Sequence, residues 1–323
     1  MKNLSFVDIQ NRTCSDNIDT FTVGSYIKFW FNSHKQNLAP NTVASYQNQI
    51  KYISAALGDL PLVKLSPIII QNFYSILLEN LSPTSVLYIH RILRNALNRA
   101  VELDLLIKNP CNAVEPPRKA KFSPVVYSRE DVVNMLNLLQ NQNKDLFLPV
   151  FLAVELGLRR GEILGLYYSD FDKENCTLSI SKSASQSVGH SMTYFTPKTE
   201  SSNRTLLLSK KQALVISYFS SFRKKSSPKN LVLKSDNTFY TPATLNHAFS
   251  AFLAKNNLPH MRFHDLRHTN ATLLLQAKIP AKIVSQRLGH SNISTTMDLY
   301  SHVMIELQEE ASVALDNLFS DIS

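Results

Sequence analysis

Residues 263–269 read Phe263-His264-Asp265-Leu266-Arg267-His268-Thr269, and helically spaced apolar residues follow at Ala271, Leu274 and Leu275. This spacing predicts a helix on which His264 and Arg267, three residues apart, lie side by side on one face. A guanidinium group is a rigid fork of donors that matches two phosphate oxygens, and a neutral imidazole beside it can carry a proton. The stretch therefore favours phosphate as the ligand of this face.

Two other interpretations of the same stretch remain open from its residues alone. His264 and Arg267 can be structural, with the arginine paired to Asp265 or Glu162, and for an isolated His-x-x-Arg pattern this is the more frequent case. His264, Asp265 and His268 also resemble the His-Glu-x-x-His helix of zinc metalloproteases. Zinc is disfavoured because Arg267 would place a fixed cation close to the metal, and because Asp is one methylene shorter than the Glu base.

The composition indicates a negatively charged partner. The chain has 323 residues, enough for two domains with separate cores, and a net charge of +9. A polyanion is the expected partner of such a chain, although a generic basic surface gives the same net charge. The three cysteines, Cys14, Cys111 and Cys176, are too far apart for a metal knuckle or a disulfide framework and indicate a reducing cytosol. Without a transmembrane-length apolar run or a signal-peptide pattern, we expect a cytoplasmic protein with no membrane contact.

The first two-fifths of the chain predict a small helical domain. Residues 1–20 are polar and are expected to form a flexible N-terminal segment, and residues 21–112 have helical periodicity. Three expected helices begin with a proline in the first turn, at Pro40, Pro67 and Pro83. Serines precede two of these prolines, at Ser66 and Ser82, and are expected to cap their helices. The last helix is expected to present a basic outer face with His90, Arg91, Arg94 and Arg99.

Residues 113–126 predict an interdomain linker, because Pro116 and Pro117 cannot continue a helix. Its cations, Arg118, Lys119 and Lys121, make it either a plain solvated connection or a strap that completes a clamp around the polyanion. A second domain over residues 127–303 is expected to open with a capping box of Ser128 and Asp131. It combines helices with strand-like stretches near 177–181, 193–199 and 204–208, which predict a small antiparallel sheet.

Five motifs from residue 157 onward resemble those of the tyrosine recombinase (phage integrase) family and occur in the family's order. They are Gly157-Leu158-Arg159-Arg160-Gly161-Glu162, Thr196-Pro197-Lys198-Thr199, the stretch 263–269, Leu288-Gly289-His290, and residues 295–303 with Tyr300. Each motif alone is weak, whereas the ordered set is specific, and the resemblance covers about residues 20–310. It implies a mainly α, two-domain fold: a helical core-binding domain, and an α+β catalytic domain with the small sheet, which together clamp duplex DNA.

The resemblance also implies six catalytic residues: Arg159, Lys198, His264, Arg267, His290 and Tyr300. Tyr300 would attack a DNA phosphodiester and form a 3′-phosphotyrosyl link. Arg159, Arg267 and His290 would bind the phosphate, Lys198 would protonate the leaving 5′-oxygen, and His264 would accept or return the phenolic proton. Glu162 matches an acidic position that orients the first arginine. Because the phosphotyrosyl link keeps the bond energy, the resemblance implies no ATP, no metal and no other cofactor.

The implied function is that of a site-specific recombinase, the integrase of a mobile element. A Xer-type resolvase of chromosome or plasmid dimers, a DNA-binding regulator without catalysis and a type IB topoisomerase are the alternatives. The implied partners are double-stranded DNA, a homo-oligomer with four protomers in the synaptic complex, and an accessory DNA-bending or excision factor. Residues 1–20 are too short for the arm-binding domain of many integrases, which leaves a simpler recombinase and a truncated chain as two open alternatives.

Residues 304–323 predict an amphipathic C-terminal helix. No Lys or Arg follows Tyr300, and apolar residues recur at three- and four-residue steps. An acidic helix is a poor ligand for DNA, so its apolar face is expected to dock on protein. Docking on its own domain is one alternative, and the resemblance implies docking on the neighbouring protomer.

Overall fold

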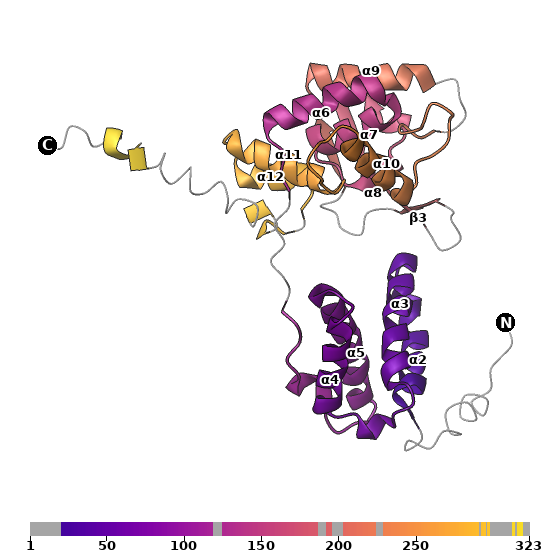
Figure 1. Ribbon diagram of the computed structural model, residues 1–323. Helices are drawn as coiled ribbons and strands as arrows, with labels where there is room; N and C mark the ends of the chain where they lie inside the picture. The colour runs from indigo at the N-terminus through magenta and orange to yellow at the C-terminus, as the bar shows by residue number, and fades with distance from the viewer. Residues whose placement is uncertain are drawn as a thin grey trace. The chain divides into compact units, whose positions relative to one another are not determined.

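The computed structural model describes residues 21–118, 125–186, 192–195, 203–223, 229–290, 292–294, 296–297, 312–313 and 315–318. The chain divides into two compact units, Met1–Phe122 and Ser123–Ser323 (Figure 1). Within the described ranges, no helix is long and apolar enough to cross a membrane.

Unit 1 is helical, and local sequence signals explain where its helices begin. Its elements are α2 (Val23–His34), η2 (Lys35–Asn37), α3 (Pro40–Leu57), η3 (Leu62–Lys64), α4 (Pro67–Leu78), α5 (Pro83–Glu102) and η4 (Pro110–Ala113). The expected first-turn prolines of α3, α4 and α5 are confirmed. Ser82 caps α5 by accepting from the backbone N–H of Ser85 at 3.2 Å, whereas Ser66 makes no such bond and its expected capping role is wrong.

The core of unit 1 satisfies its polar groups internally. The hydroxyl of Tyr26, which is fully buried on α2, donates to the carbonyl of Ala96 on α5 at 2.7 Å. His90 is buried as well, with Nδ1 2.9 Å from the hydroxyl of Tyr74. The expectation that His90 belongs to the basic outer face of α5 is therefore wrong, because a partner inside the core makes its burial tolerable. The other three basic residues of that expected face, Arg91, Arg94 and Arg99, are exposed.

Unit 2 is built around a buried helix. Its helices are α6 (Arg129–Gln142), α7 (Lys144–Glu155), α8 (Arg160–Gly165), α9 (Lys210–Arg223), α10 (Pro242–Lys255), α11 (Asp265–Gln276) and α12 (Ala281–Leu288). Every residue of α7 from Leu146 to Val154 is buried, and α6 and α11 pack against it. The capping box of Ser128 and Asp131 at the start of α6 is confirmed by its two reciprocal bonds, both 3.1 Å.

The strands of unit 2 form two small antiparallel sheets in the described residues. β1 (Phe171–Asp172), β2 (Thr177–Ile180) and β5 (Arg204–Leu207) pair in the order β1-β2-β5, and β3 (Ser183–Gln186) pairs with β4 (Met192–Phe195). A short 3-10 turn, η5 (Tyr168–Asp170), precedes β1. The expected fold class, mainly α with a small antiparallel sheet in the second domain, is confirmed. Arg204, opposite Ile180, is the first residue of β5.

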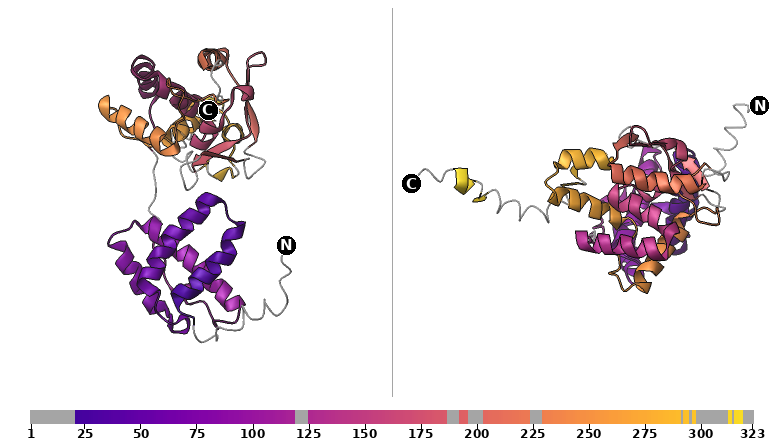
Figure 2. Two further views of the ribbon diagram at one scale, coloured as in Figure 1. Left: turned by 90° about the vertical axis from the view of Figure 1, so that its right-hand side faces the viewer. Right: turned by 90° about the horizontal axis from the view of Figure 1, so that it is seen from above.

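Helices α11 and α12, drawn in orange, pack against each other on one side of unit 2 (Figure 2). Helix α12 ends at Leu288, and Gly289 follows with a φ of 68°, in the left-handed region that glycine adopts without strain. This turn brings His290 back over the end of the helix, where its backbone N–H donates to the carbonyl of Ser285.

Candidate active site

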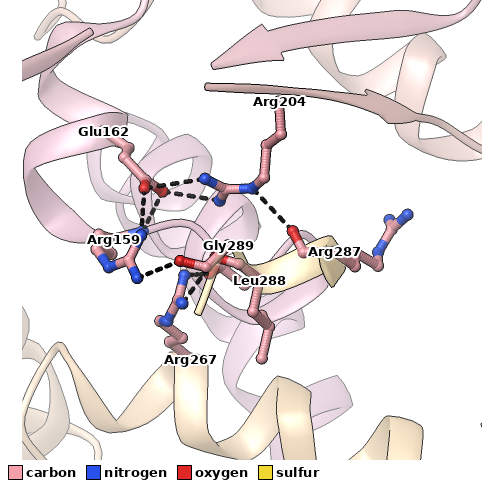
Figure 3. A network of polar contacts seen from close by, with 8 residues as sticks. Arg159, Glu162, Arg204, Arg267, Arg287, Leu288 and Gly289 are labelled. Carbon is pink, nitrogen blue, oxygen red and sulfur yellow. Dashed lines mark hydrogen bonds and ion pairs between the residues drawn. The ribbon is translucent and has the colours of Figure 1, made fainter. Parts of the chain in front are cut away.

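Three arginines donate to three consecutive backbone carbonyls at the C-terminal end of α12 (Figure 3). Arg204 Nε donates to Arg287 O at 2.8 Å, Arg267 Nη2 to Leu288 O at 2.7 Å, and Arg159 Nη2 to Gly289 O at 2.6 Å. The last carbonyls of a helix lack partners within the helix and carry partial negative charge, so cations stabilise them. The end of α12 is thus held by side chains from β5, α11 and the start of α8.

Arg267 is almost fully buried, and its second contact is with the backbone carbonyl of Gly157. Its Nη1 donates to Gly157 O at 2.6 Å, and Gly157 has a φ of 67°. A Cβ at Gly157 would lie 2.2 Å from Cδ2 of Leu288 and 2.7 Å from Oδ1 of Asn270, so glycine is required for both space and conformation. Desolvation, and then the charge of Arg159, lower the pKa of Arg267 to about 9, which leaves the guanidinium charged at neutral pH.

Glu162 holds Arg159 at the start of α8. Its carboxylate accepts from the backbone N–H of Arg159 at 2.9 Å and from Nη1 at 2.8 Å, which fits the interpretation of Glu162 as an orienting residue. The carboxylate also accepts from Arg204. Burial alone would raise the pKa of Glu162, but hydrogen bonds and charge from Arg204, and then from Arg159, hold the pKa below its ordinary value. The carboxylate is therefore ionised at neutral pH.

Neither carboxylate suggested as a structural partner of Arg267 pairs with it. Asp265 forms an ion pair with Arg262 at 2.7 Å, and Glu162 pairs with Arg159 and Arg204. The guanidinium of Arg267 instead donates to two carbonyl groups. These carbonyls satisfy some of its N–H donors but carry no full negative charge, and neither Asp265 nor Glu162 neutralises it through an ion pair. Such an arrangement can attract a phosphate.

His264 lies at the start of α11 but is not in its first turn. It is the N-cap residue, with helical backbone angles, and its carbonyl accepts from the backbone N–H of Arg267 at 3.2 Å. Its ring is exposed and lies edge-on to that of His268, with centroids 5.2 Å apart. Partial desolvation, then the charges of His268 and Arg267, lower the pKa of His264 to about 4. The imidazole is therefore neutral at pH 7 and able to accept a proton.

His290 follows the α12 turn, and a buried hydroxyl positions its ring. Nδ1 lies 2.8 Å from Oγ1 of Thr296, which is fully buried. When this hydroxyl donates to Nδ1, the ring proton is on Nε2, so the neutral histidine is a hydrogen-bond donor. Desolvation, then the charges of Arg267 and Arg159, lower the pKa of His290 to about 3.

The structure describes four of the six residues predicted to be catalytic, and it brings three of them to the end of α12. Arg159, Arg267 and His290 gather there, and His264 lies at the start of the helix that carries Arg267. Lys198, in the chain between β4 and β5, and Tyr300, which follows Met297, lie outside the described residues. The contacts of Arg204 and Thr296 with the site residues were not expected from the sequence. A basic residue at the start of the strand-like stretch 204–208 was the available signal for Arg204.

The half-buried neutral histidine His290 predicts a pH dependence of stability. Between pH 6.5, the ordinary pKa, and about pH 3, the unfolded chain binds a proton at His290 that the folded protein does not. The free energy of unfolding is therefore expected to fall as the pH falls through this window, with the contribution fully present above pH 6.5. Urea unfolding at about pH 7.5 and about pH 5 measures this slope.

The variant His290→Asn is expected to flatten the slope, because it removes the titrating group. The exposed histidine variant His247→Gln is the matched control and should retain the slope of the unsubstituted protein. An equal slope in His290→Asn would show that other groups cause the pH dependence.

Family models match both units of the chain. The model described as "Phage integrase family" matches residues 127–306, which is more than half of the chain. The model described as "Phage integrase, N-terminal SAM-like domain" matches residues 22–78.

Two relatives are similar over most of the chain. A "Tyrosine recombinase XerC-like" protein of Caldanaerobacter subterraneus subsp. tengcongensis is 28% identical over 92% of this chain and 83% of the relative. The ICEBs1 integrase of Bacillus subtilis is 27% identical and covers 84% of this chain and 77% of the relative.

Solved structures share the fold. The Tn1549 transposon integrase, in complex with transposon right end DNA, superposes with a TM-score of 0.79 at 22% identity, over 90% of this chain and all of that one. A lambda integrase tetramer bound to a Holliday junction gives a TM-score of 0.67 at 18% identity, over 90% of this chain and 83% of the other. Each of these two proteins is thus bound to DNA in its own structure.

Proposed function

Since the chain belongs to the phage integrase family of tyrosine recombinases, we propose that it acts as a site-specific recombinase that integrates or excises a mobile DNA element. The observation that carries the proposal is the gathering of Arg159, Arg267 and His290 at the end of α12. Two guanidinium groups and a neutral imidazole there can donate to the oxygens of one phosphodiester. The net charge of +9 supports duplex DNA as the substrate.

In this proposal, Tyr300 is the nucleophile. A phenol with an ordinary pKa of about 10 is mostly protonated at neutral pH, so it must lose its proton during the attack. His264, neutral and exposed, accepts that proton. Arg159 and Arg267 offset the charge that builds up on the non-bridging oxygens in the pentavalent transition state, and His290 donates a further hydrogen bond. The phosphorus becomes linked to Tyr300, and the 5′-oxygen of the DNA leaves.

Lys198 protonates the leaving 5′-oxygen in this mechanism. Lys198→Ala is therefore expected to slow cleavage by roughly 10²- to 10⁴-fold, the usual size of a general-acid contribution. In a substrate with sulfur at the 5′-bridging position, the leaving group is a thiolate that needs no proton. This substrate should therefore restore most of the lost rate. Cleavage assays with matched oxygen and sulfur substrates measure both effects.

Lys210→Ala is the control, because this lysine begins α9 beyond the proposed site. It should cleave both substrates at the rates of the unsubstituted protein. A Lys198→Ala defect that sulfur does not relieve would move the acid role to another residue.

The C-terminal segment, residues 304–323, is proposed to dock on a neighbouring protomer. Its described residues, 312–313 and 315–318, are helical, and Val313, Leu315 and Leu318 are each more than half exposed. A head-to-tail contact of this kind closes a ring when four protomers assemble on paired DNA sites. An accessory DNA-bending or excision factor is a further partner of such an assembly.

Deletion of residues 306–323 is expected to leave binding to a single DNA site nearly unchanged and to abolish cooperative binding and recombination. The apolar face would then be missing, while every Lys and Arg of the chain, and so the positive charge that favours DNA, is retained. Gel-shift titration on single and paired sites, together with a recombination assay, separates the two outcomes. A truncated protein that recombines at the full-length rate would show that the segment packs on its own domain.

The mobile-element role competes with a Xer-type role in the resolution of chromosome or plasmid dimers. The ICEBs1 relative and the Tn1549 structure, both named integrases, support the first, and the XerC-like relative supports the second. Covalent capture on nicked fragments of the source genome, followed by sequencing of the captured DNA, tests the choice. Junctions of a mobile element are the expected sequences, and a single chromosomal site without such an element would favour the Xer role.

The alternative that is not an enzyme is a DNA-binding regulator without catalytic activity. It would bind DNA with the same basic surface and would yield no covalent complex at all. The capture experiment therefore separates this alternative from both recombinase roles.

A further inference from the structure

Arg204 is a buried arginine in the candidate active site. It is not one of the six proposed catalytic residues. Its side chain is 8% exposed, and that of Glu162 is 4% exposed. Nη1 and Nη2 donate to the two carboxylate oxygens of Glu162 at 3.0 and 2.9 Å, which is the paired, fork-like geometry of a strong ion pair (Figure 3). Removal of one member of a buried ion pair leaves the other as an uncompensated charge, so the two residues act together.

Glu162 is shared between two arginines that differ in their surroundings. It accepts from Arg204, which is buried, and from Arg159, whose side chain is 35% exposed. Each carboxylate oxygen is engaged by both residues, because Oε1 accepts from the two side chains and Oε2 accepts from Arg204 and from the backbone of Arg159. The negative charge of Glu162 is thus divided, and Arg159 is oriented by the carboxylate without being fully neutralised by it.

We infer that Arg204 is a positioning residue for the phosphate-binding arginine Arg159, acting through Glu162; this inference rests on the proposed recombinase function. Arg204 keeps Glu162 ionised and fixed, and it balances the carboxylate so that the charge of Arg159 remains available to a DNA phosphate. The four charged groups Glu162, Arg159, Arg204 and Arg267 sum to +2, and loss of Arg204 would leave +1. In that case Glu162 would pair with Arg159 alone.

Arg204 also connects separate parts of the site. Its Nε donates to the backbone carbonyl of Arg287. Two residues further along the chain, the carbonyl of Gly289 accepts from Arg159. As the first residue of β5, it lies six positions after Lys198 in the chain. One side chain therefore joins the start of β5, the helix that begins after Arg159 and the turn that carries His290.

A double-mutant cycle tests the inference. Arg204→Gln, Glu162→Gln and the double variant are compared for the rate of covalent complex formation at saturating DNA and for the DNA dissociation constant. Arg204→Gln is expected to reduce the rate about tenfold or more with little change in DNA affinity. In the Glu162→Gln background the same substitution should change the rate by less than about threefold, because Arg204 acts through that carboxylate. Arg204→Lys, which keeps the charge but not the fork, should recover part of the rate.

Circular dichroism melting separates this role from a purely structural one. Arg99→Gln is the matched control, since it removes an arginine that is paired to a carboxylate, but both side chains are more than half exposed and lie in the other unit. It should retain the rate of the unsubstituted protein. A folded Arg204→Gln that forms the complex at that rate, or an equal rate loss in both Glu162 backgrounds, would overturn the inference. Failure of the unsubstituted protein to form any covalent complex would instead contradict the proposed function.

Discussion

Replacement of Tyr300 by Phe is expected to abolish the covalent protein–DNA complex and to leave DNA binding intact. The substitution removes one oxygen, the atom that would form the ester bond with phosphorus, and retains the aromatic ring. No remaining group of a phenylalanine can attack a phosphodiester, so the rate should fall by more than about 10⁴-fold, to below detection. Incubation with a nicked duplex, followed by denaturing electrophoresis, measures the complex, and gel shift measures binding.

Tyr52→Phe is the matched control, because Tyr52 is an exposed tyrosine of α3 in the other unit. It should form the complex at the rate of the unsubstituted protein. A covalent complex that persists in Tyr300→Phe would remove Tyr300 as the nucleophile.

Arg267→Lys is expected to impair both stability and cleavage, although it keeps the charge. Two different nitrogens of Arg267 donate to Gly157 O and Leu288 O, at 2.6 and 2.7 Å, and the single nitrogen of a lysine cannot hold both carbonyls in this geometry. One buried carbonyl would lose its partner, at a cost of about 1–3 kcal/mol in the free energy of unfolding. The lost donors to the transition state should slow cleavage by about 10²-fold or more.

Urea unfolding and the rate of covalent complex formation measure the two effects of Arg267→Lys. Arg99→Lys serves as control, because the side chains of Arg99 and its partner Glu102 are both more than half exposed, so this ion pair contributes little to stability. The account of Arg267 would fail if Arg267→Lys unfolded at the same urea concentration as the unsubstituted protein and cleaved DNA at a similar rate.

Local signals in the sequence predicted much of the fold. The prolines that open α3, α4 and α5 and the capping box of α6 act within three or four residues, so their effects can be recognised in a linear pattern. Gly157 was recognised as part of a family-like motif, and the reason that it must be glycine was not predicted. The lack of space for a Cβ arises from Leu288 and Asn270, which lie more than a hundred residues further along the chain.

The polar partners in the site could not be predicted, because pairing depends on tertiary structure. Arg204 binds Glu162 across 42 residues and the carbonyl of Arg287 across 83. Nothing in the spacing of charged residues states which cation shares the carboxylate of Glu162. For the same reason a carboxylate partner of Arg267 remained an open alternative in the sequence, whereas its contacts are carbonyls fixed by two separate turns. His90 was misplaced because its partner Tyr74 is on another helix.

The central claim is that Tyr300 becomes linked to the 3′-phosphate of cleaved DNA, and one measurement tests it directly. The protein is trapped on a nicked duplex, digested with trypsin and analysed by mass spectrometry. No Lys or Arg follows Arg287, so trypsin releases residues 288–323 as one C-terminal peptide, in which Tyr300 is the only tyrosine. We expect this peptide to carry the nucleotide through a 3′-phosphotyrosyl bond, with a free 5′-hydroxyl on the released strand. A link at any other residue, or a link to a 5′-phosphate, would contradict the account.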